Sequence, residues 1–189
     1  MNNTLQHRLW IFSMVAAPVL ISIAQFFWVN GLLTITAGWI QVLSFTFWIV
    51  ALQGMFSFLK IELPKYAVVG FLIAVYACIG GAGFGYDGIY TNAFGYTTQA
   101  EIDGLIAKIG AGIIPVLFLP GALFPLSLAV LGIQLIRTKK IAPWIGIFLF
   151  VAAIGFPLSR IPRIDILAHF DNLLLIVSHV LVAIKIKTQ

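Results

Sequence analysis

Polar and ionisable side chains recur on one face of the last apolar segment, residues 166–184. Asp165, His169, Asn172 and His179 follow one another at spacings of four, three and seven residues. At about 100° per residue, these positions fall within a sector of about 80° on one helix face. Ionisable groups are costly at membrane depth and usually face a cavity, a partner or a proton path. This face therefore predicts a site for a small polar or protonatable ligand, with a purely structural ion-pair cluster as the alternative.

Five further polar residues complete this candidate site. Arg160 and Arg163 come just before the face and supply counter-charges for its acidic residues, and Asp171 lies on an adjacent line of the same segment. Gln25 and Gln53 lie on polar faces of the first and second apolar segments. We expect these two faces to turn toward the centre of the bundle, where they either contact the ligand or form hydrogen bonds between helices.

Histidine and cysteine usage excludes most metal and redox chemistry. The three histidines are His7, His169 and His179, and the last two lie about 15 Å apart along a helix, too far to share one ion. A single b-type haem held by His7 and His179 stays as a redox alternative, whereas a two-haem carrier would need four histidine ligands. Cys78 is the single cysteine, which excludes an intramolecular disulfide and a Cys-x-x-Cys site. With no G-x-S-x-G or H-E-x-x-H motif, the sequence favours a non-enzymatic role without metal or cofactor.

The elements that position these residues are membrane-spanning helices. The chain has 189 residues, of which 61% are apolar and 9% charged, and so small a water-soluble domain could not bury that much apolar surface. The apolar runs are continuous, as in membrane helices, and do not alternate as in a β-barrel. We therefore predict an all-α polytopic membrane helix bundle, a single domain over residues 1–189. The six expected transmembrane helices are residues 9–29, 35–58, 66–86, 112–136, 141–158 and 166–184.

Basic residues predict the orientation of the bundle. With both termini inside, eight Lys and Arg fall in inner segments, and only Lys108, Arg160 and Arg163 fall outside. The longest connection, residues 87–111, is then external and could fold over the outer mouth of the bundle. Within it, Thr98 and Glu101 have the spacing of a capping box, so we expect a helix to begin there.

Prolines and glycines indicate where the helices bend or pack closely. Pro115, Pro120 and Pro125 each remove a backbone donor, so the span at 112–136 should be kinked or partly unwound. The glycines in CIGGAGFG lie at the end of a predicted membrane helix and do not follow a strand, which excludes a dinucleotide-binding motif. We interpret them as sites of close helix packing.

The stretch GALFPLSLAVLGIQLIRTKKIAPWIGIFLF, followed by FPLSRIP, resembles the later helices of small bacterial multi-pass membrane proteins of undetermined activity. The resemblance covers about the last 75 residues and contains no catalytic motif. It implies a bacterial inner membrane as the location and no particular reaction.

Three classes of function agree with the sequence. The leading one is binding or transport of a small, proton-linked ligand through a polar cavity lined by the last segment. The second is a non-catalytic accessory or regulatory subunit of a membrane complex, and the third is the single-haem redox protein. The expected partners are the lipid bilayer, a small polar ligand and a second copy or a larger membrane complex. Nucleic acid is excluded because the basic residues are scattered between apolar segments and form no continuous stripe.

Overall fold

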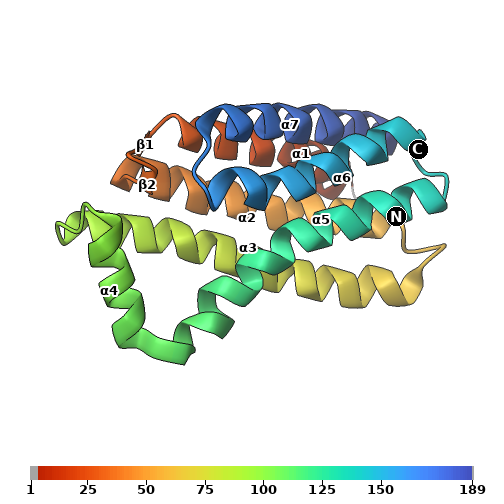
Figure 1. Cartoon of the computed structure of the whole chain (residues 1–189). Helices are drawn as coiled ribbons and strands as arrows, with labels where there is room; N and C mark the ends of the chain where they lie inside the picture. Colours follow the sequence, from red (N-terminus) through yellow and green to blue (C-terminus); the bar gives the residue numbers. More distant parts are fainter. Residues whose placement is uncertain (1–3, 189) are drawn as a thin grey trace.

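The computed structural model describes residues 4–188, in which seven α-helices form an elongated bundle (Figure 1). The helices are α1 (Thr4–Gln25), α2 (Ile35–Phe58), α3 (Pro64–Ala93), α4 (Gln99–Ile109), α5 (Leu119–Arg137), α6 (Pro143–Arg160) and α7 (Asp165–Lys187). Within the described residues, six helical segments are long and apolar enough to cross a membrane, the fourth running from Ile114 to Arg137. The chain is therefore an all-α, multi-pass membrane protein, which confirms the fold class expected from composition.

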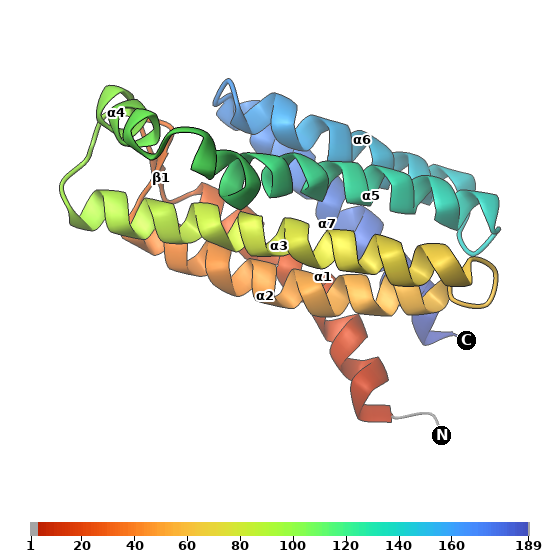
Figure 2. The ribbon, with the colours of Figure 1, turned by 90° about the horizontal axis from the view of Figure 1, so that it is seen from below.

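The six long helices form a closed ring in the order α1, α2, α3, α5, α6 and α7. Each packs against its neighbours along this order, and α7 returns to pack against α1. Figures 1 and 2 show the helices running alternately up and down the bundle, with the described N- and C-terminal ends at the same end. We call the opposite end, where α4 lies, the distal end. This arrangement agrees with an even number of membrane crossings.

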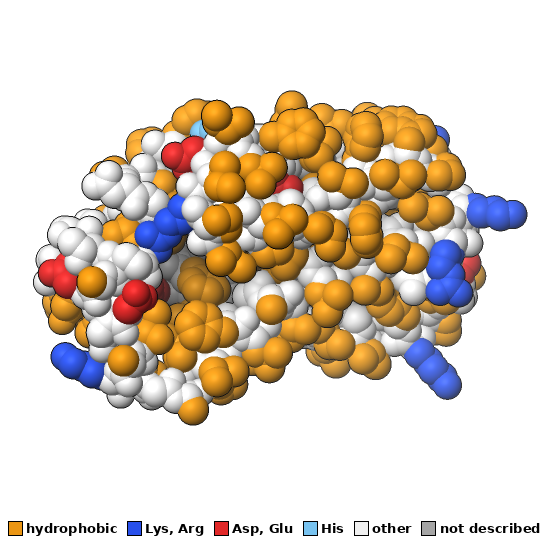
Figure 3. All heavy atoms as spheres, viewed as in Figure 1, with side chains coloured by type: hydrophobic (Ala, Val, Ile, Leu, Met, Phe, Trp, Pro, Cys, Tyr) orange, Lys and Arg blue, Asp and Glu red, His pale blue; other side chains and the backbone are white. Residues whose placement is uncertain are grey.

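Apolar side chains fill the middle of the ring and also cover its outside. Trp48 of α2, Phe124 of α5 and His179 of α7 are among the largest fully enclosed side chains. Figure 3 shows apolar side chains over the length of the bundle and Lys and Arg side chains at the end that holds the termini. Outward residues such as Leu72, 63% exposed, are suited to contact lipid chains.

The first span ends earlier than the sequence predicted. Helix α1 stops at Gln25, and the chain then forms a short antiparallel hairpin of β1 (Trp28–Val29) and β2 (Leu32–Leu33). Asn30 and Gly31 make the turn with φ values of 52° and 73°, the left-handed conformation that a two-residue type I′ hairpin requires. The Asn-Gly pair between apolar residues is typical of a hairpin, and the prediction of a helix at residues 9–29 did not take it into account.

The third span extends further than predicted. Helix α3 continues to Ala93, so the first part of the expected external loop 87–111 is helical. The glycine-rich turns stay helical because they pack tightly against α2: a Cβ at Gly81 would overlap the ring of Phe45. The close packing expected at these glycines is therefore present.

The segment before α5 is irregular, as its prolines predicted. Residues Ile114–Phe118 form a π-helical turn, in which the Leu119 amide donates to the carbonyl of Ile114, five residues back. In this register the carbonyl of Pro115 would receive the amide of residue 120, but that residue is proline and has no N–H. The hydroxyl of Tyr76 on α3 donates to the Pro115 carbonyl instead. The irregular turn is thus fastened to α3 by a side chain that replaces the missing donor.

Candidate functional site

The predicted polar face of α7 divides among several neighbouring helices. At its distal end, Asp165 accepts a hydrogen bond from Nε2 of Gln25 at 3.3 Å, and the ring of His169 lies 4.6 Å from that of Phe26. Both contacts are to α1 or to the residue just after it. The structure thus brings Gln25 and Asp165 together, and their hydrogen bond joins α1 to α7.

One turn further along, α7 binds the last residue of α6. The guanidinium of Arg160 donates to Asp171 at 3.2 Å and to Oδ1 of Asn172 at 2.6 Å. The side chain of Asp171 is 2% exposed and that of Arg160 12%, so this ion pair is largely buried. Arg160 also donates to the hydroxyl of Ser159 and stacks over the ring of Phe156. The expected counter-charge for Asp171 is therefore Arg160.

His179 lies deepest and is completely enclosed. Its Nδ1 is 2.7 Å from the carbonyl of Leu175, and a carbonyl only accepts, so Nδ1 carries the hydrogen. The ring meets that of Trp48 edge to face, with centroids 4.6 Å apart. Its other ring nitrogen, Nε2, is buried and has no hydrogen-bond partner in the described chain. The single-haem alternative stays a prediction.

The polar face of α2 points the other way from the prediction. Gln53 is exposed on the outside of the bundle, where its side-chain carbonyl accepts from the indole N–H of Trp10 at 3.3 Å. The face was expected to turn inward, but α2 contributes Trp48, Leu52 and Met55 to the core, and Gln53 falls on its outer side. Gln53 is therefore removed from the inward-facing set.

A recess that suits a ligand lies at the distal end of the described chain and has a volume of about 650 Å³. We call it the distal cavity. Its wall comes from the hairpin, α2, α3, α4, α5 and the end of α6 with the connection to α7, and is mainly apolar and aromatic. Figure 3 shows the surface hollowed beside α4, with basic side chains at the rim. The polar side chains in the wall are Gln41, Asp87, Thr91, Gln99, Arg160 and Arg163.

The distal cavity shares two residues with the predicted site. Of the candidate residues, Arg160 and Arg163 line the distal cavity, but the described wall does not include Asp165, His169, Asp171, Asn172, His179, Gln25 or Gln53. The α7 residues are turned away because α7 packs between α1 and α6. Asp171 Oδ1, Asn172 Nδ2 and His179 Nε2 are buried there without a hydrogen-bond partner in the described chain. Sequence periodicity could not reveal this, since it fixes a helix face without identifying its neighbour.

Arg163 joins three segments at the mouth of the distal cavity. It lies in the connection between α6 and α7 with a φ of 58°, an uncommon conformation for a residue other than glycine. The stem of its side chain packs against Gly31 at the tip of the hairpin, and its guanidinium donates to the side-chain carbonyl of Gln99 at the start of α4. No carboxylate within residues 4–188 forms an ion pair with it. Its positive charge is therefore available to a ligand.

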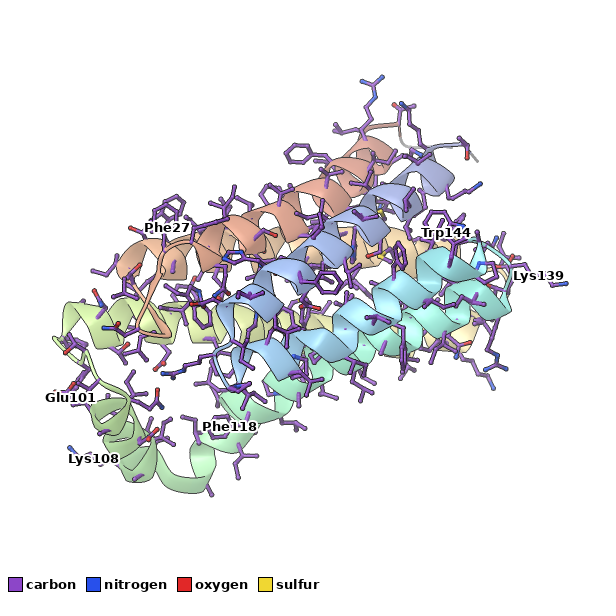
Figure 4. All side chains as sticks on the ribbon, turned by 45° about the horizontal axis from the view of Figure 1, so that its top comes forward. Phe27, Glu101, Lys108, Phe118, Lys139 and Trp144 are labelled. Atoms are coloured by element: carbon purple, nitrogen blue, oxygen red, sulfur yellow. The ribbon has the colours of Figure 1, made fainter. Side chains whose placement is uncertain are left out.

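Helix α4 covers one side of the distal cavity. It begins with the capping box that the sequence predicted: the Thr98 hydroxyl accepts from the Glu101 amide, and the Glu101 carboxylate accepts from the Thr98 amide at 2.9 Å. Three hydrogen bonds to the Glu101 carboxylate, the first from the Thr98 hydroxyl and the others from the amides of Thr97 and Thr98, lower the pKa of Glu101. Figure 4 shows α4, with Glu101 and Lys108, standing apart from Phe118, the residue just before α5. Its apolar residues Ile102 and Ile106 face the cavity.

Four polar residues of the wall were missed by the sequence interpretation. Gln41 donates to the backbone carbonyl of Gly81 on α3 at 2.9 Å, and Gln99 binds Arg163. Asp87 and Thr91 were assigned to the loop, although their spacing of four residues is that of one helix face. That spacing was the available signal.

Comparisons of this chain with protein-family models, with curated proteins and with solved structures find no match. The geometry of the site is therefore the basis for assigning a function.

Proposed function

We propose that this protein binds a small amphipathic molecule with an acidic head group in the distal cavity. The observation that carries the proposal is a cavity of about 650 Å³ with a mainly apolar wall and an arginine that has no carboxylate partner at its mouth. Ligand sites typically enclose about 300 to 1,000 Å³ and combine apolar walls with a few placed polar groups. The mainly apolar wall suits the apolar part of such a molecule.

Arg163 is the residue that would bind the acidic group. The charge of Arg160 is balanced by Asp171, whereas Arg163 donates only to the uncharged Gln99. A carboxylate or phosphate would form stronger, charge-assisted hydrogen bonds with a guanidinium than an amide does. An acidic ligand would therefore replace Gln99 as the partner of Arg163, while its apolar part lies against the aromatic wall.

The packing beneath the distal cavity favours binding over transport. Trp48, Phe124 and His179 close the centre of the ring, with Trp48 in edge-to-face contact with both other rings. A continuous path to the other end would require these rings to separate. The proposed setting is a bacterial cell membrane with both termini in the cytoplasm, supported by the distribution of Lys and Arg and by the resemblance of the later helices.

The test uses the tryptophan in the cavity wall. A brominated long-chain fatty acid should quench the fluorescence of Trp28, which lines the distal cavity, in the purified full-length protein. The matched probe is the brominated alcohol of the same chain length, which differs only in the head group. We expect both probes to quench, with the acid binding about tenfold more tightly, because a charge-assisted hydrogen bond stabilises by roughly 1.5 kcal/mol. A Trp28→Phe variant identifies the part of the signal that comes from the cavity.

Variants of Arg163 and Lys108 distinguish binding at the distal cavity from attraction to surface charge in general. Arg163→Gln should remove the preference for the acid and leave binding of the alcohol unchanged. Lys108→Gln is the matched control, because Lys108 is exposed on α4 and lies outside the cavity wall. If the acid and the alcohol quench equally, or if both variants lose the preference to the same extent, the acidic ligand is wrong. If neither probe quenches Trp28, the cavity is not the binding site.

A further inference from the structure

A second recess lies beside the distal cavity, at the end of α3. It has a volume of about 570 Å³, and we call it the Asp87 pocket. Its wall is formed by Asp87, Tyr90, Thr91, Phe94, Tyr96 and Leu105. One carboxylate therefore lies among three aromatic rings.

The end of α3 places these side chains together. Asp87, Tyr90, Thr91 and Phe94 are spaced by three, one and three residues, so they share one face of the last two helical turns. Gly95 then adopts a φ of 82° and reverses the chain.

A Schellman motif brings the third ring back to this face. The amide of Tyr96 donates to the carbonyl of Thr91 at 2.9 Å, and the amide of Gly95 donates to that of Asn92 at 3.1 Å. In this motif the residue after the glycine normally packs against the helix residue that its amide reaches. The backbone therefore places Tyr96 beside Thr91, one turn from Asp87. The end of helix α3 thus fixes the position of Tyr96.

The carboxylate of Asp87 has no partner in the described chain. None of the side-chain hydrogen bonds or ion pairs within residues 4–188 involves it. The nearby hydroxyl of Thr91 donates to the backbone carbonyl of Asp87 at 2.7 Å, so that hydroxyl does not neutralise the acid. A half-buried carboxylate without a counter-charge favours a cationic ligand.

The aromatic rings specify which kind of cation fits. Tyr90 is 59% exposed and Phe94 75% exposed, and neither ring stacks on another aromatic ring in the described residues. Faces of aromatic rings attract cations, and rings grouped around an acidic side chain are a common way to bind quaternary ammonium groups. A strongly hydrated metal ion would instead need more oxygen ligands than one carboxylate supplies.

We propose that the Asp87 pocket binds an alkylammonium group, either in a free amine or in the head group of a lipid. Asp87 supplies the counter-charge, and Tyr90, Phe94 and Tyr96 surround the alkyl groups. The proposal is independent of the acidic ligand at Arg163, although Asp87, Thr91 and Tyr96 line both recesses. One molecule with both charges would therefore be able to occupy both sites.

The first experiment compares two ligands of the same shape. Choline and its uncharged isostere 3,3-dimethylbutan-1-ol are titrated into the purified full-length protein and detected by saturation-transfer NMR at constant ionic strength. We expect choline to bind and the alcohol to bind at least about tenfold more weakly, because only choline carries the charge. Equal binding of the two compounds would overturn the proposal.

Matched variants assign the binding to the pocket. Asp87→Asn should weaken choline binding by about tenfold, whereas Asp103→Asn, which removes an exposed carboxylate on α4 outside the pocket, should have no effect. Tyr90→Leu should weaken binding by about threefold. Tyr86→Leu is its control, because Tyr86 is similarly exposed on α3, one turn earlier, and does not line the pocket. Equal effects within either pair would contradict the assignment.

A lipid experiment distinguishes the two sources of the ammonium group. The protein is reconstituted with mixed phosphatidylcholine and phosphatidylglycerol, and the lipids it retains are counted by native mass spectrometry. Retention of phosphatidylcholine that is lost in Asp87→Asn identifies a lipid head group, and binding of free choline alone identifies a soluble amine. If neither compound depends on Asp87, the pocket does not bind ammonium groups. The comparison of choline with its isostere uses the unmodified protein, so it still tests the proposal should a variant fail to fold.

Discussion

The buried ion pair between α6 and α7 allows a quantitative test of the packing. Arg160→Met would leave the carboxylate of Asp171, whose side chain is 2% exposed, without its counter-charge. Removing one partner of a buried ion pair costs about 3 to 5 kcal/mol, and we expect the upper half of that range here. Asp171→Leu would leave the charge of Arg160 without a partner. We expect a loss of about 3 kcal/mol in the free energy of unfolding, because that guanidinium lines the distal cavity and is better hydrated than Asp171.

The double variant is the informative measurement. With both charges removed, the remaining loss is mainly the hydrogen bond to Asn172, or about 1 to 2 kcal/mol. The two single losses would sum to roughly 7 kcal/mol, so we expect a coupling energy of several kcal/mol. The assay is reversible unfolding in mixed detergent micelles, followed by circular dichroism. Losses that add within about 0.5 kcal/mol would show that the two charges do not depend on each other, and would refute the buried pair.

A second ion pair serves as a control for the first. Lys140 lies 2.7 Å from Glu62 at the end of the bundle that holds the termini, where the side chains are 16% and 34% exposed. The hydrogen bond from Lys140 lowers the pKa of Glu62. Water and salt screen such a pair, so Glu62→Gln should leave the unfolding transition nearly unchanged.

Three further outcomes test other parts of the structure. Reporters fused in the connection between α3 and α4 and at the C-terminus should report opposite sides of the membrane, and the same side for both would show a miscounted span. Gly155→Ala should lower stability, because its Cβ would overlap the carboxylate of Asp171, whereas Gly104→Ala, with open space around it, should not, as thermal unfolding of both variants would show. The pKa of Glu101 lies below its ordinary value of 4.5, because Thr98 and nearby amides bind the charged form. Its contribution to α4 should therefore be complete above pH 4.5 and be lost as the pH falls through the lowered pKa, as NMR chemical shifts along α4 would report; a helix unaffected by acid would contradict this.

Several elements could be predicted from sequence because one local rule determines them. The apolar run of α2 gives the observed bounds 35–58, since nothing within it competes with a membrane helix. The capping box at Thr98 depends only on residues three positions apart. The irregular turn before α5 follows from proline chemistry, although the compensating donor, Tyr76, lies on another helix and had no sequence signal.

The outward position of Gln53 shows why the polar faces could not all be placed. A helix with polar residues on one side turns that side inward only if the opposite side has nothing larger to bury. In α2 the opposite side carries Trp48, which packs in edge-to-face contact with both Phe124 and His179. Burying the large ring of Trp48 stabilises the fold more than burying the amide of Gln53 would, because that amide has a hydrogen-bond partner, Trp10, at the surface.

The distal cavity was beyond sequence reasoning for a related reason: its wall is assembled from six parts of the chain. Periodicity shows which residues of one helix share a face, but the order of the helices in the ring decides what that face meets. In this ring, α7 lies between α1 and α6, so its acidic and imidazole groups are used to join helices. Arg163 escapes this use because it lies after the end of α6, where a left-handed backbone conformation directs it to Gly31 and α4. Among the candidate residues, Arg163 thus lies between two helices, and within residues 4–188 its guanidinium has no carboxylate partner.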